Sequence, residues 1–173
     1  YGLPQSRKRM FAGKFPLALL QSYRAKCEKR TLGDVLRAVK QNIVIDPVWG
    51  IRLPKKEVTG LQSETALNGE EVRMNSDSKR HHPVYNQMQF PDSINRPART
   101  VTATCTRVSR ESIIIADGKN KFRRLSVRER ATLQSFPITY EFYGSSYSSR
   151  LKMIGNALPP VIAYFLGMAM REV

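Results

Sequence analysis

The chain has 173 residues, of which 41% are hydrophobic, so it is long enough to bury the core of about one domain. Its 29 Lys and Arg residues outnumber 14 Asp and Glu residues and give a formal net charge of +15, which indicates a polyanionic partner such as nucleic acid. Two cysteines and two histidines exclude a disulfide framework and a zinc set, so we expect an intracellular protein without a metal.

A membrane surface is the competing partner for a chain this basic. No stretch approaches the roughly 20 apolar residues of a membrane span, and no basic amphipathic helix stands out, so we expect no membrane association. The first residue is Tyr1 rather than a methionine. We therefore expect a segment excised from a longer protein, with further sequence upstream.

In the first half of the chain, residues 9–15 predict a short strand and residues 17–29 predict no definite state. Thr31 is a good N-cap, and the apolar spacing after it predicts a helix over 32–40. Residues 43–95 contain short apolar runs broken by proline and glycine, with a polar stretch at 70–82. This pattern predicts loops and short strands.

In the second half, residues 99–106, 112–116 and 122–125 predict three short strands, with a turn at Asp117-Gly118. Ser126 and Glu129 form a capping-box pattern that predicts a helix through about Gln134. Residues 158–170 predict a final apolar helix. No internal repeat or low-complexity segment is present.

Three local patterns stand out, and the first lies at the N-terminus. Gln5, Arg7 and Arg9 alternate, so an extended chain would point all three side chains to one face. Such a row of side chains can bind a planar or anionic group. The alternative interpretation is a solvated basic start of a strand.

The second pattern is the capped helix within 124–137, which by physics alone is structural. The third spans 150–160, where Gly155-Asn156 precedes an apolar helix and two prolines. A helix start with free backbone N–H groups binds carboxylates or phosphates. An asparagine acting only as N-cap explains the third pattern equally well.

In this order the three patterns resemble motifs VIII, IX and X of the cytosine-C5 DNA methyltransferases. The residues quoted are Gln-x-Arg-x-Arg at 5–9, Leu-Ser-Val-Arg-Glu with Leu-Gln-Ser-Phe-Pro at 125–137, and Ile-Gly-Asn-Ala-Leu-Pro-Pro at 154–160. The region between the first two patterns corresponds to the target-recognition region of that family. The resemblance therefore covers essentially the whole chain.

The resemblance implies catalytic roles for two arginines. In that family the second arginine of motif VIII bonds O2 of the flipped-out target cytosine, which corresponds to Arg9, while Arg7 and Gln5 support it. A permanently charged donor suits this role, because negative charge builds on the ring as a thiolate attacks carbon 6. Arg128 and Glu129 of motif IX are implied to be structural.

The resemblance also implies a cofactor, S-adenosyl-L-methionine, with Asn156 and Ala157 near its methionine end. The family often has serine at the position of Ala157, so only a backbone contact carries over there. No Gly-rich cofactor turn, Pro-Cys nucleophile or Glu-Asn-Val element is present in the sequence. We therefore expect the chain to be inactive alone and to need the N-terminal catalytic half, in the same chain or as a separate subunit.

The recognition region is expected to bind double-stranded DNA. Thr102 matches a threonine that contacts phosphate in the family. Four arginines are candidates for contacts with phosphates, or less often with base edges: Arg80, Arg96, Arg99 and Arg107.

Several other residues are given ordinary structural roles. The adjacent His81 and His82 are interpreted as surface residues, Cys105 as a strand residue rather than the nucleophile, and Trp49 as a core residue rather than a base-stacking one.

Two other classes remain as alternatives. One is a catalytically idle DNA-binding module of the same fold. The other is a basic RNA-binding or ribosome-associated protein, which explains the charge and none of the three patterns. An upstream Pro-Cys pair would separate the first alternative from the enzyme, and competition between RNA and DNA would test the second.

The expected fold class is a mixed α/β chain. Residues 1–16 and 150–173 are expected to be terminal pieces of a Rossmann-like S-adenosylmethionine-dependent domain, and residues 17–149 a small, mostly β target-recognition domain. The two termini should lie near each other, and apolar surface within 161–170 should be exposed without the missing half. The family's usual bacterial setting is restriction and modification.

Overall fold

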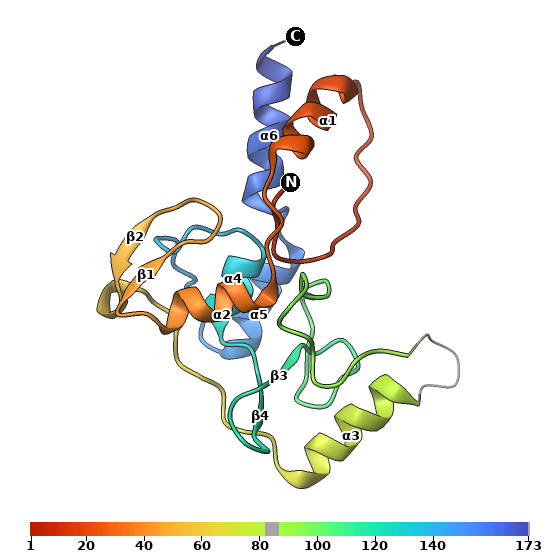
Figure 1. Cartoon of the computed structure of the whole chain (residues 1–173), viewed down its shortest axis with the longest axis vertical. Helices are drawn as coiled ribbons and strands as arrows, with labels where there is room; N and C mark the ends of the chain where they lie inside the picture. Colours follow the sequence, from red (N-terminus) through yellow and green to blue (C-terminus); the bar gives the residue numbers. More distant parts are fainter. Residues whose placement is uncertain (82–86, 173) are drawn as a thin grey trace.

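The computed structural model describes residues 1–81 and 87–172, and Figure 1 shows the chain as a central body with an arm of two helices. Its helices are α1 (Leu17–Lys26), α2 (Leu32–Lys40), α3 (Gly69–Arg80), α4 (Val127–Leu133), α5 (Tyr147–Asn156) and α6 (Pro160–Arg171), with a 3₁₀ turn at Lys55–Glu57. Its strands are β1 (Ile43–Ile45), β2 (Arg52–Pro54), β3 (Ile114–Ala116) and β4 (Phe122–Arg124). The chain is therefore mixed α and β, as expected.

The strands form two separate antiparallel hairpins, β1 with β2 and β3 with β4. Ile43 pairs with Pro54, and Ile114 pairs with Arg124. Two-stranded hairpins cannot bury a core alone, so each needs other elements to cover one face. Ile113 and Ile115 accordingly pack into the main core with α2 and α4.

The main core forms where α2, α4 and α5 meet. Leu32, Val35 and Leu36 of α2 face Ala131 and Leu133 of α4, and all are buried. Thr31 caps α2 in a capping box with Asp34, and Ser126 caps α4 in another with Glu129. Both predicted helices are confirmed, because local capping and apolar spacing agree with the tertiary packing at these positions.

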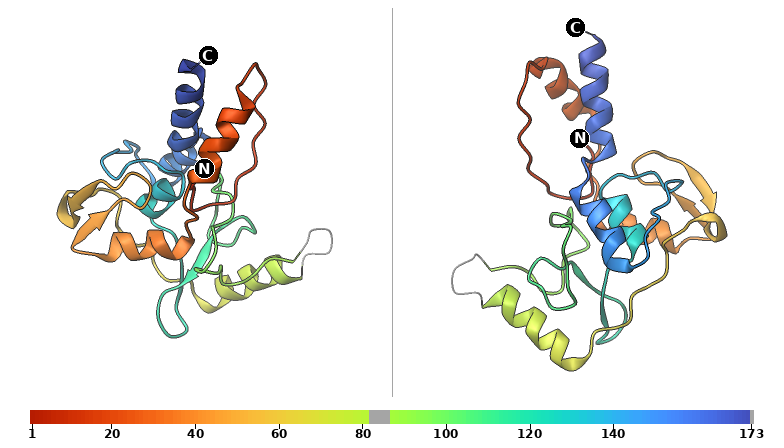
Figure 2. Two further views of the ribbon diagram at one scale, coloured as in Figure 1. Left: turned by 45° about the horizontal axis from the view of Figure 1, so that its top comes forward. Right: turned by 180° about the vertical axis from the view of Figure 1, so that it is seen from behind.

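The arm consists of α1 and α6, which lie side by side in all three views of Figures 1 and 2. The rings of Tyr1 and Tyr23 lie 5.6 and 5.5 Å from the ring of Phe165 on α6. Tyr1 thus contacts the last helix, as expected for neighbouring termini. Of the apolar surface expected at 161–170, Val161 and Ala169 are buried, whereas Tyr164 and Met170 are exposed.

Three local predictions are wrong. Residues 9–15 and 99–106 form no strand, and the backbone of Val101 bonds to the side chains of Gln5 and Arg7 instead of to a neighbouring strand. The polar stretch at 70–82 is predicted as loop, yet residues 69–80 form α3, which begins with a capping box between Asn68 and Glu71. This helix has no apolar stripe for sequence periodicity to detect.

The expected mostly β middle region is also wrong. Among the described residues of 17–149, regular structure comprises helices α1 to α4, the start of α5 and only two short hairpins. Polar side chains cap these helices and form part of their buried faces where the apolar periodicity is weak. His82 lies outside the described residues, while His81 is exposed as expected.

One region bears on the expectation about membranes. Residues Tyr147–Arg171 are long and apolar enough to cross a membrane by length and composition alone. In the structure this region is two helices, α5 and α6, that break at Pro159. Leu151 and Ile154 of α5 are buried among other elements of the protein.

Candidate functional site

The three sequence patterns meet in one buried polar cluster, which we call the amide hub: Gln5, Arg7, Gln134 and the backbone of 101–103 and 154–155. Gln5 Nε2 donates to Gln134 Oε1, and Gln5 Oε1 accepts from the backbone N–H of Val101 at 3.0 Å. Gln134 Nε2 donates to the carbonyl of Ile154 at 2.8 Å. Both glutamine side chains are buried, so their hydrogen bonds, which are neutral, join segments of the hub that are distant in sequence.

Arg7 lies on the solvent-facing side of the hub. Its guanidinium donates to the carbonyl of Val101 at 2.8 Å and to that of Gly155 at 2.9 Å. Burial, followed by the nearby positive charge of Arg9, lowers the pKa of Arg7. Arg7 is therefore held in place, and it lies close enough to Arg9 for the two charges to interact.

Gly155 allows the closest approach in the hub. A Cβ atom at this position would lie 2.2 Å from the backbone nitrogen of Ala103 and 2.4 Å from the carbonyl carbon of Thr102. Only glycine fits at such a separation. The third pattern thus packs directly against the segment that holds Thr102.

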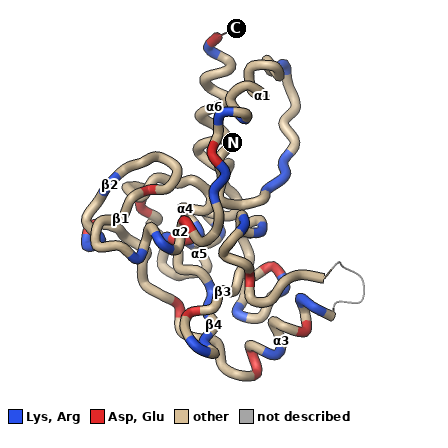
Figure 3. The backbone as a smooth tube through the Cα atoms, viewed as in Figure 1, with Lys and Arg blue, Asp and Glu red and all other residues tan. Residues whose placement is uncertain are grey.

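The predicted face of three alternating side chains does not form. Gln5 and Arg7 turn into the hub, whereas Arg9 is exposed, and within the described residues its guanidinium donates only to the carbonyl of Lys8, at 2.7 Å. Arg9 is left with free donors on the loop that leads from the N-terminus to α1. Figure 3 shows Lys and Arg gathered on this loop.

Asn156 is the last residue of α5, and α6 begins only after Pro159. Gly155-Asn156 thus precedes an apolar helix that begins at prolines, as predicted, but Asn156 ends α5 and is not the N-cap of α6. A helix C-terminus carries partial negative charge and free carbonyl groups, so it favours a cationic rather than an anionic group. Asn156 is exposed, and the half-buried Ala157 packs on the main core.

Thr102 is half-buried beside the hub, and its hydroxyl donates to the carbonyl of Thr104 at 2.9 Å. Arg96 is exposed. Arg80 donates to the carbonyl of Phe90 at 2.6 Å and lies over the ring of Phe90. Arg80, Arg96 and Thr102 therefore keep a polar group at or near the surface.

Two of the predicted DNA-binding arginines are engaged internally instead. Arg99 donates to both carboxylate oxygens of Asp92, at 2.7 and 3.0 Å, and to the carbonyls of Arg110 and Ser112. Arg107 forms a bidentate pair with Glu71 and also donates to the carbonyl of Ala66 at 2.9 Å. Their guanidinium groups brace the fold.

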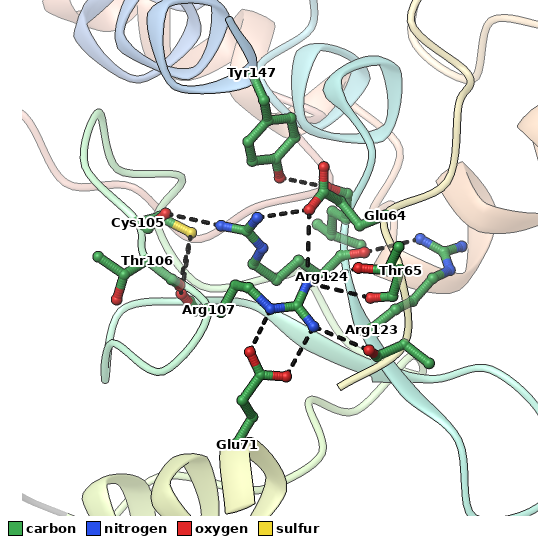
Figure 4. A network of polar contacts seen from close by, with 12 residues as sticks. Glu64, Thr65, Glu71, Cys105, Thr106, Arg107, Arg123, Arg124 and Tyr147 are labelled. Carbon is green, nitrogen blue, oxygen red and sulfur yellow. Dashed lines mark hydrogen bonds and ion pairs between the residues drawn. The ribbon is translucent and has the colours of Figure 1, made fainter. Parts of the chain in front are cut away.

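Figure 4 shows the second polar cluster, the arginine network, which consists of Glu64, Glu71, Arg107 and Arg124 with Tyr147. Arg124 donates to Glu64 at 2.6 Å and lies 4.7 Å from the ring centre of Tyr147. Arg107 fastens α3 to the loop at 64–66. The hydrogen bond from Arg107 is the main cause that lowers the pKa of Glu71 to about 2.

Arg128 and Glu129 have structural roles, as expected. Glu129 receives two bonds of 2.8 Å from Arg123, which raise the pKa of Arg123, and it also caps α4. Arg128 donates to backbone carbonyls of Thr59, Pro137 and Tyr140, and burial lowers its pKa. Neither side chain is available to a ligand.

Two further sequence interpretations can be compared with the structure. Trp49 is half-buried, donates to the carbonyl of Ser135 at 2.7 Å and packs edge-on against Tyr164, which confirms a packing role. Cys105 lies in a loop rather than a strand, and its sulfur accepts from Arg130 at 2.7 Å. Within residues 1–81 and 87–172, no three His, Cys, Asp or Glu side chains could hold a metal ion together.

Sequence reasoning missed the roles of Gln134 and Ser135. The hydroxyl of Ser135 accepts from the backbone N–H of Val161 at 3.0 Å, which ties α6 to the end of α4. Both residues lie in the quoted Leu-Gln-Ser-Phe-Pro pattern. The available signal was two polar residues directly after an apolar helix, which by itself does not name their partners.

Comparison with known proteins supports the family that the three sequence patterns resemble. The sequence model of the C-5 cytosine-specific DNA methylase family matches residues 1–172. The chain therefore belongs to the C-5 cytosine-specific DNA methylase family, whose members use S-adenosyl-L-methionine as methyl donor.

Individual relatives match shorter parts of the chain. Type II methyltransferase M.FnuDI of Fusobacterium nucleatum is 43% identical over 58 residues, 34% of this chain and 17% of that protein. M.AplI of Arthrospira platensis is 39% identical over 80 residues, 43% of this chain and 22% of that protein. DNA (cytosine-5)-methyltransferase 2 of Arabidopsis thaliana is 44% identical over 50 residues, 3% of its length. The chain thus spans about a fifth of the first two relatives.

Proposed function

We propose that this chain is the C-terminal, DNA-reading portion of a type II DNA (cytosine-5-)-methyltransferase. The amide hub is the observation that carries the proposal. Arg9, Thr102 and the C-terminal end of α5 are direct continuations of the segments that the hub joins. This arrangement supports a site in which a flipped base, a DNA phosphate and a methyl donor come together.

In this proposal Arg9 supplies the hydrogen bonds to the target cytosine. Its free guanidinium donors stabilise negative charge on the base during attack by a thiolate from the upstream half. Arg7 anchors the start of the loop that carries Arg9 through its hydrogen bonds to the carbonyls of Val101 and Gly155. The adjacent positive charges of Arg7 and Arg9 also favour the anionic state of the base.

S-adenosyl-L-methionine supplies the methyl group when bound. The residues present fit its methionine end, because the partial negative charge at the C-terminal end of α5 favours a cation and the Asn156 amide is exposed there. Asn156 and the backbone of Ala157 would hold that end.

Contact with double-stranded DNA is assigned to Thr102, Arg96 and Arg80, which lie at or near the surface. Arg99 and Arg107, whose guanidinium groups are engaged by Asp92 and Glu71, hold the recognition region in shape. We place residues 1–16 and 150–173 with the catalytic domain and residues 17–149 with the recognition domain. The packing of α1 on α6 supports moving that first boundary to about residue 30.

Exposed apolar side chains on the arm and on the loop before it support contact with an upstream catalytic half. Met10 is 94% exposed, Leu17 67% and Met170 60%. A surface of this kind is costly in water and is normally covered. We expect the chain alone to self-associate and the joined protein to elute as a monomer in size-exclusion chromatography.

The test is transfer of labelled methyl from S-adenosyl-L-methionine to mixed-sequence duplex DNA. We would compare this chain alone, the chain joined to its upstream segment, and the joined protein with Arg9→Ala. Activity is expected only in the joined form, and Arg9→Ala should lower it about 100-fold or more.

Arg24→Ala is the matched control, because Arg24 is also exposed but lies on α1. It should leave the rate unchanged. If the joined protein binds DNA in a salt-sensitive way and transfers no methyl, the chain is an idle DNA-binding module instead.

A further inference from the structure

The segment 87–99, which follows α3, crosses the recognition region beside the N-terminal pattern. A pocket of about 570 Å³ lies along it, lined among others by Ser6, Gln87, Gln89, Arg96 and Ala98. Ser6 is directly between Gln5 and Arg7 of the amide hub. The pocket therefore opens next to the residues proposed to hold the target cytosine.

Anchored and exposed side chains alternate at the start of this segment. The backbone N–H of Met88 donates to the carbonyl of Lys79 at 2.8 Å, and its sulfur accepts from Arg99 and Arg110 at 3.1 Å each. Phe90 is buried and packs on Phe122. Gln87 and Gln89, on either side of Met88, are exposed to solvent.

The far end of the segment is fastened at three further points. The carbonyl of Arg96 accepts from the N–H of Leu32 at 2.9 Å, where α2 begins. The N–H of Ala98 donates to the carbonyl of Pro4 at 2.8 Å, and its own carbonyl accepts from the N–H of Ser6 at 2.7 Å. Asp92 and Arg99 pair across the segment. Its backbone is thus fixed relative to the hub.

The polar side chains on this fixed backbone are exposed, unlike other polar side chains nearby. Gln87, Gln89 and Arg96 are exposed, in contrast to Arg99 and Arg107, whose guanidinium groups are engaged in carboxylate pairs. Glutamine amides match the paired donor and acceptor of adenine in the major groove, and a guanidinium matches the two acceptors of guanine. Recognition of a base edge requires a rigid backbone and side chains that are free to form two hydrogen bonds with the base.

We propose that Gln87, Gln89 and Arg96 read base edges of duplex DNA beside the target cytosine and so determine the sequence that is methylated. This inference rests on the proposed function. The neighbouring Arg80 and Thr102 contact the backbone of the same DNA and carry no sequence information.

The test uses the full-length methyltransferase that contains this chain and a pool of duplexes with randomised bases around a central cytosine. Methylated positions are read by bisulfite sequencing. Gln87→Ala, Gln89→Ala and Arg96→Ala should each relax the preference at one base position by about tenfold or more. Arg96→Lys keeps the charge and loses the bidentate geometry, so it should relax the same position as Arg96→Ala.

Gln41→Ala and Arg52→Ala are the matched controls. Gln41 directly follows α2, Arg52 begins β2, and both are exposed and do not line the pocket. They should leave the sequence profile unchanged. A uniform fall in methylation with an unchanged profile, or wild-type behaviour of all three alanine variants, would overturn the inference. An unmodified enzyme that methylates no duplex in the pool would instead overturn the proposed function.

Discussion

The amide hub and the arginine network of Figure 4 both join segments far apart in sequence, but they use different chemistry. The hub pairs two buried glutamine amides with backbone groups, and a glycine lets two backbones touch. The arginine network pairs guanidinium groups with carboxylates that are partly exposed. Neutral buried bonds resist salt and pH, whereas partly exposed ion pairs respond to both.

This difference fits the roles proposed for the two regions. The hub lies where the three sequence patterns meet, beside the residues proposed to hold the target cytosine. The arginine network fastens α3 and the loop at 64–66 around the recognition region. Ion pairs between long side chains tolerate small displacements better than backbone in van der Waals contact.

The largest effect is expected for Gly155→Ala. The added Cβ meets the backbone of Thr102 and Ala103, which cannot move as the end of a side chain can, so we expect a loss of about 3 kcal/mol in the free energy of unfolding. Thermal unfolding of the whole protein measures it.

Gly167→Ala is the matched control in α6, because nothing lies within 4 Å of its Cβ position. It should stabilise the protein by about 0.5–1 kcal/mol, since alanine is the better helix former. Equal effects of the two substitutions would show that the hub has no tight backbone contact.

A smaller loss is expected for Gln5→Ala. The backbone N–H of Val101 and the amide of Gln134 each lose a partner while they stay buried, which costs about 1–3 kcal/mol. Urea unfolding at low and high salt should give the same loss, because no net charge is involved. The exposed Gln41→Ala should change stability by less than about 0.5 kcal/mol, and a strong salt dependence of the Gln5→Ala effect would contradict a neutral hub.

The smallest effect is expected for Glu71→Gln in the arginine network, and it should depend on pH. The hydrogen bond from Arg107, followed by that from the backbone of Asn68, lowers the pKa of Glu71 to about 2. A carboxyl whose pKa is lower in the folded than in the unfolded protein stabilises the fold above its unfolded pKa of about 4.5. That contribution is lost as the pH falls from about 4.5 towards 2.

Urea midpoints measured from pH 7 down to pH 2 should therefore converge for Glu71→Gln and the parent protein. High salt should also reduce their difference at pH 7. Glu70→Gln is the matched control, because Glu70 is the exposed neighbour on the same first turn of α3. A Glu71→Gln difference that persists at pH 2 would place the effect in packing rather than in the ion pair.

Part of the fold was predictable from local sequence. The helices at 32–40 and 127–133 follow from capping boxes at Thr31 and Ser126 combined with apolar spacing, and the final helix follows from its apolar run. α3 was missed because its stability comes from its cap and from tertiary contacts such as that of Asn75 with the carbonyl of Arg107. Helical propensity without an apolar stripe resembles a polar loop in sequence.

The sequence by itself determined the family, through three patterns in a fixed order, and the structural roles of Arg128 and Glu129. Only the tertiary structure decided which arginines are free: Arg9 and Arg96 are exposed, whereas Arg7, Arg99 and Arg107 are held by carbonyls or carboxylates. Local residue types set which groups can bond, whereas the partners of a side chain come from segments up to 148 positions away, as for Arg7 and Gly155. Such distant pairing has no local signature in the chain.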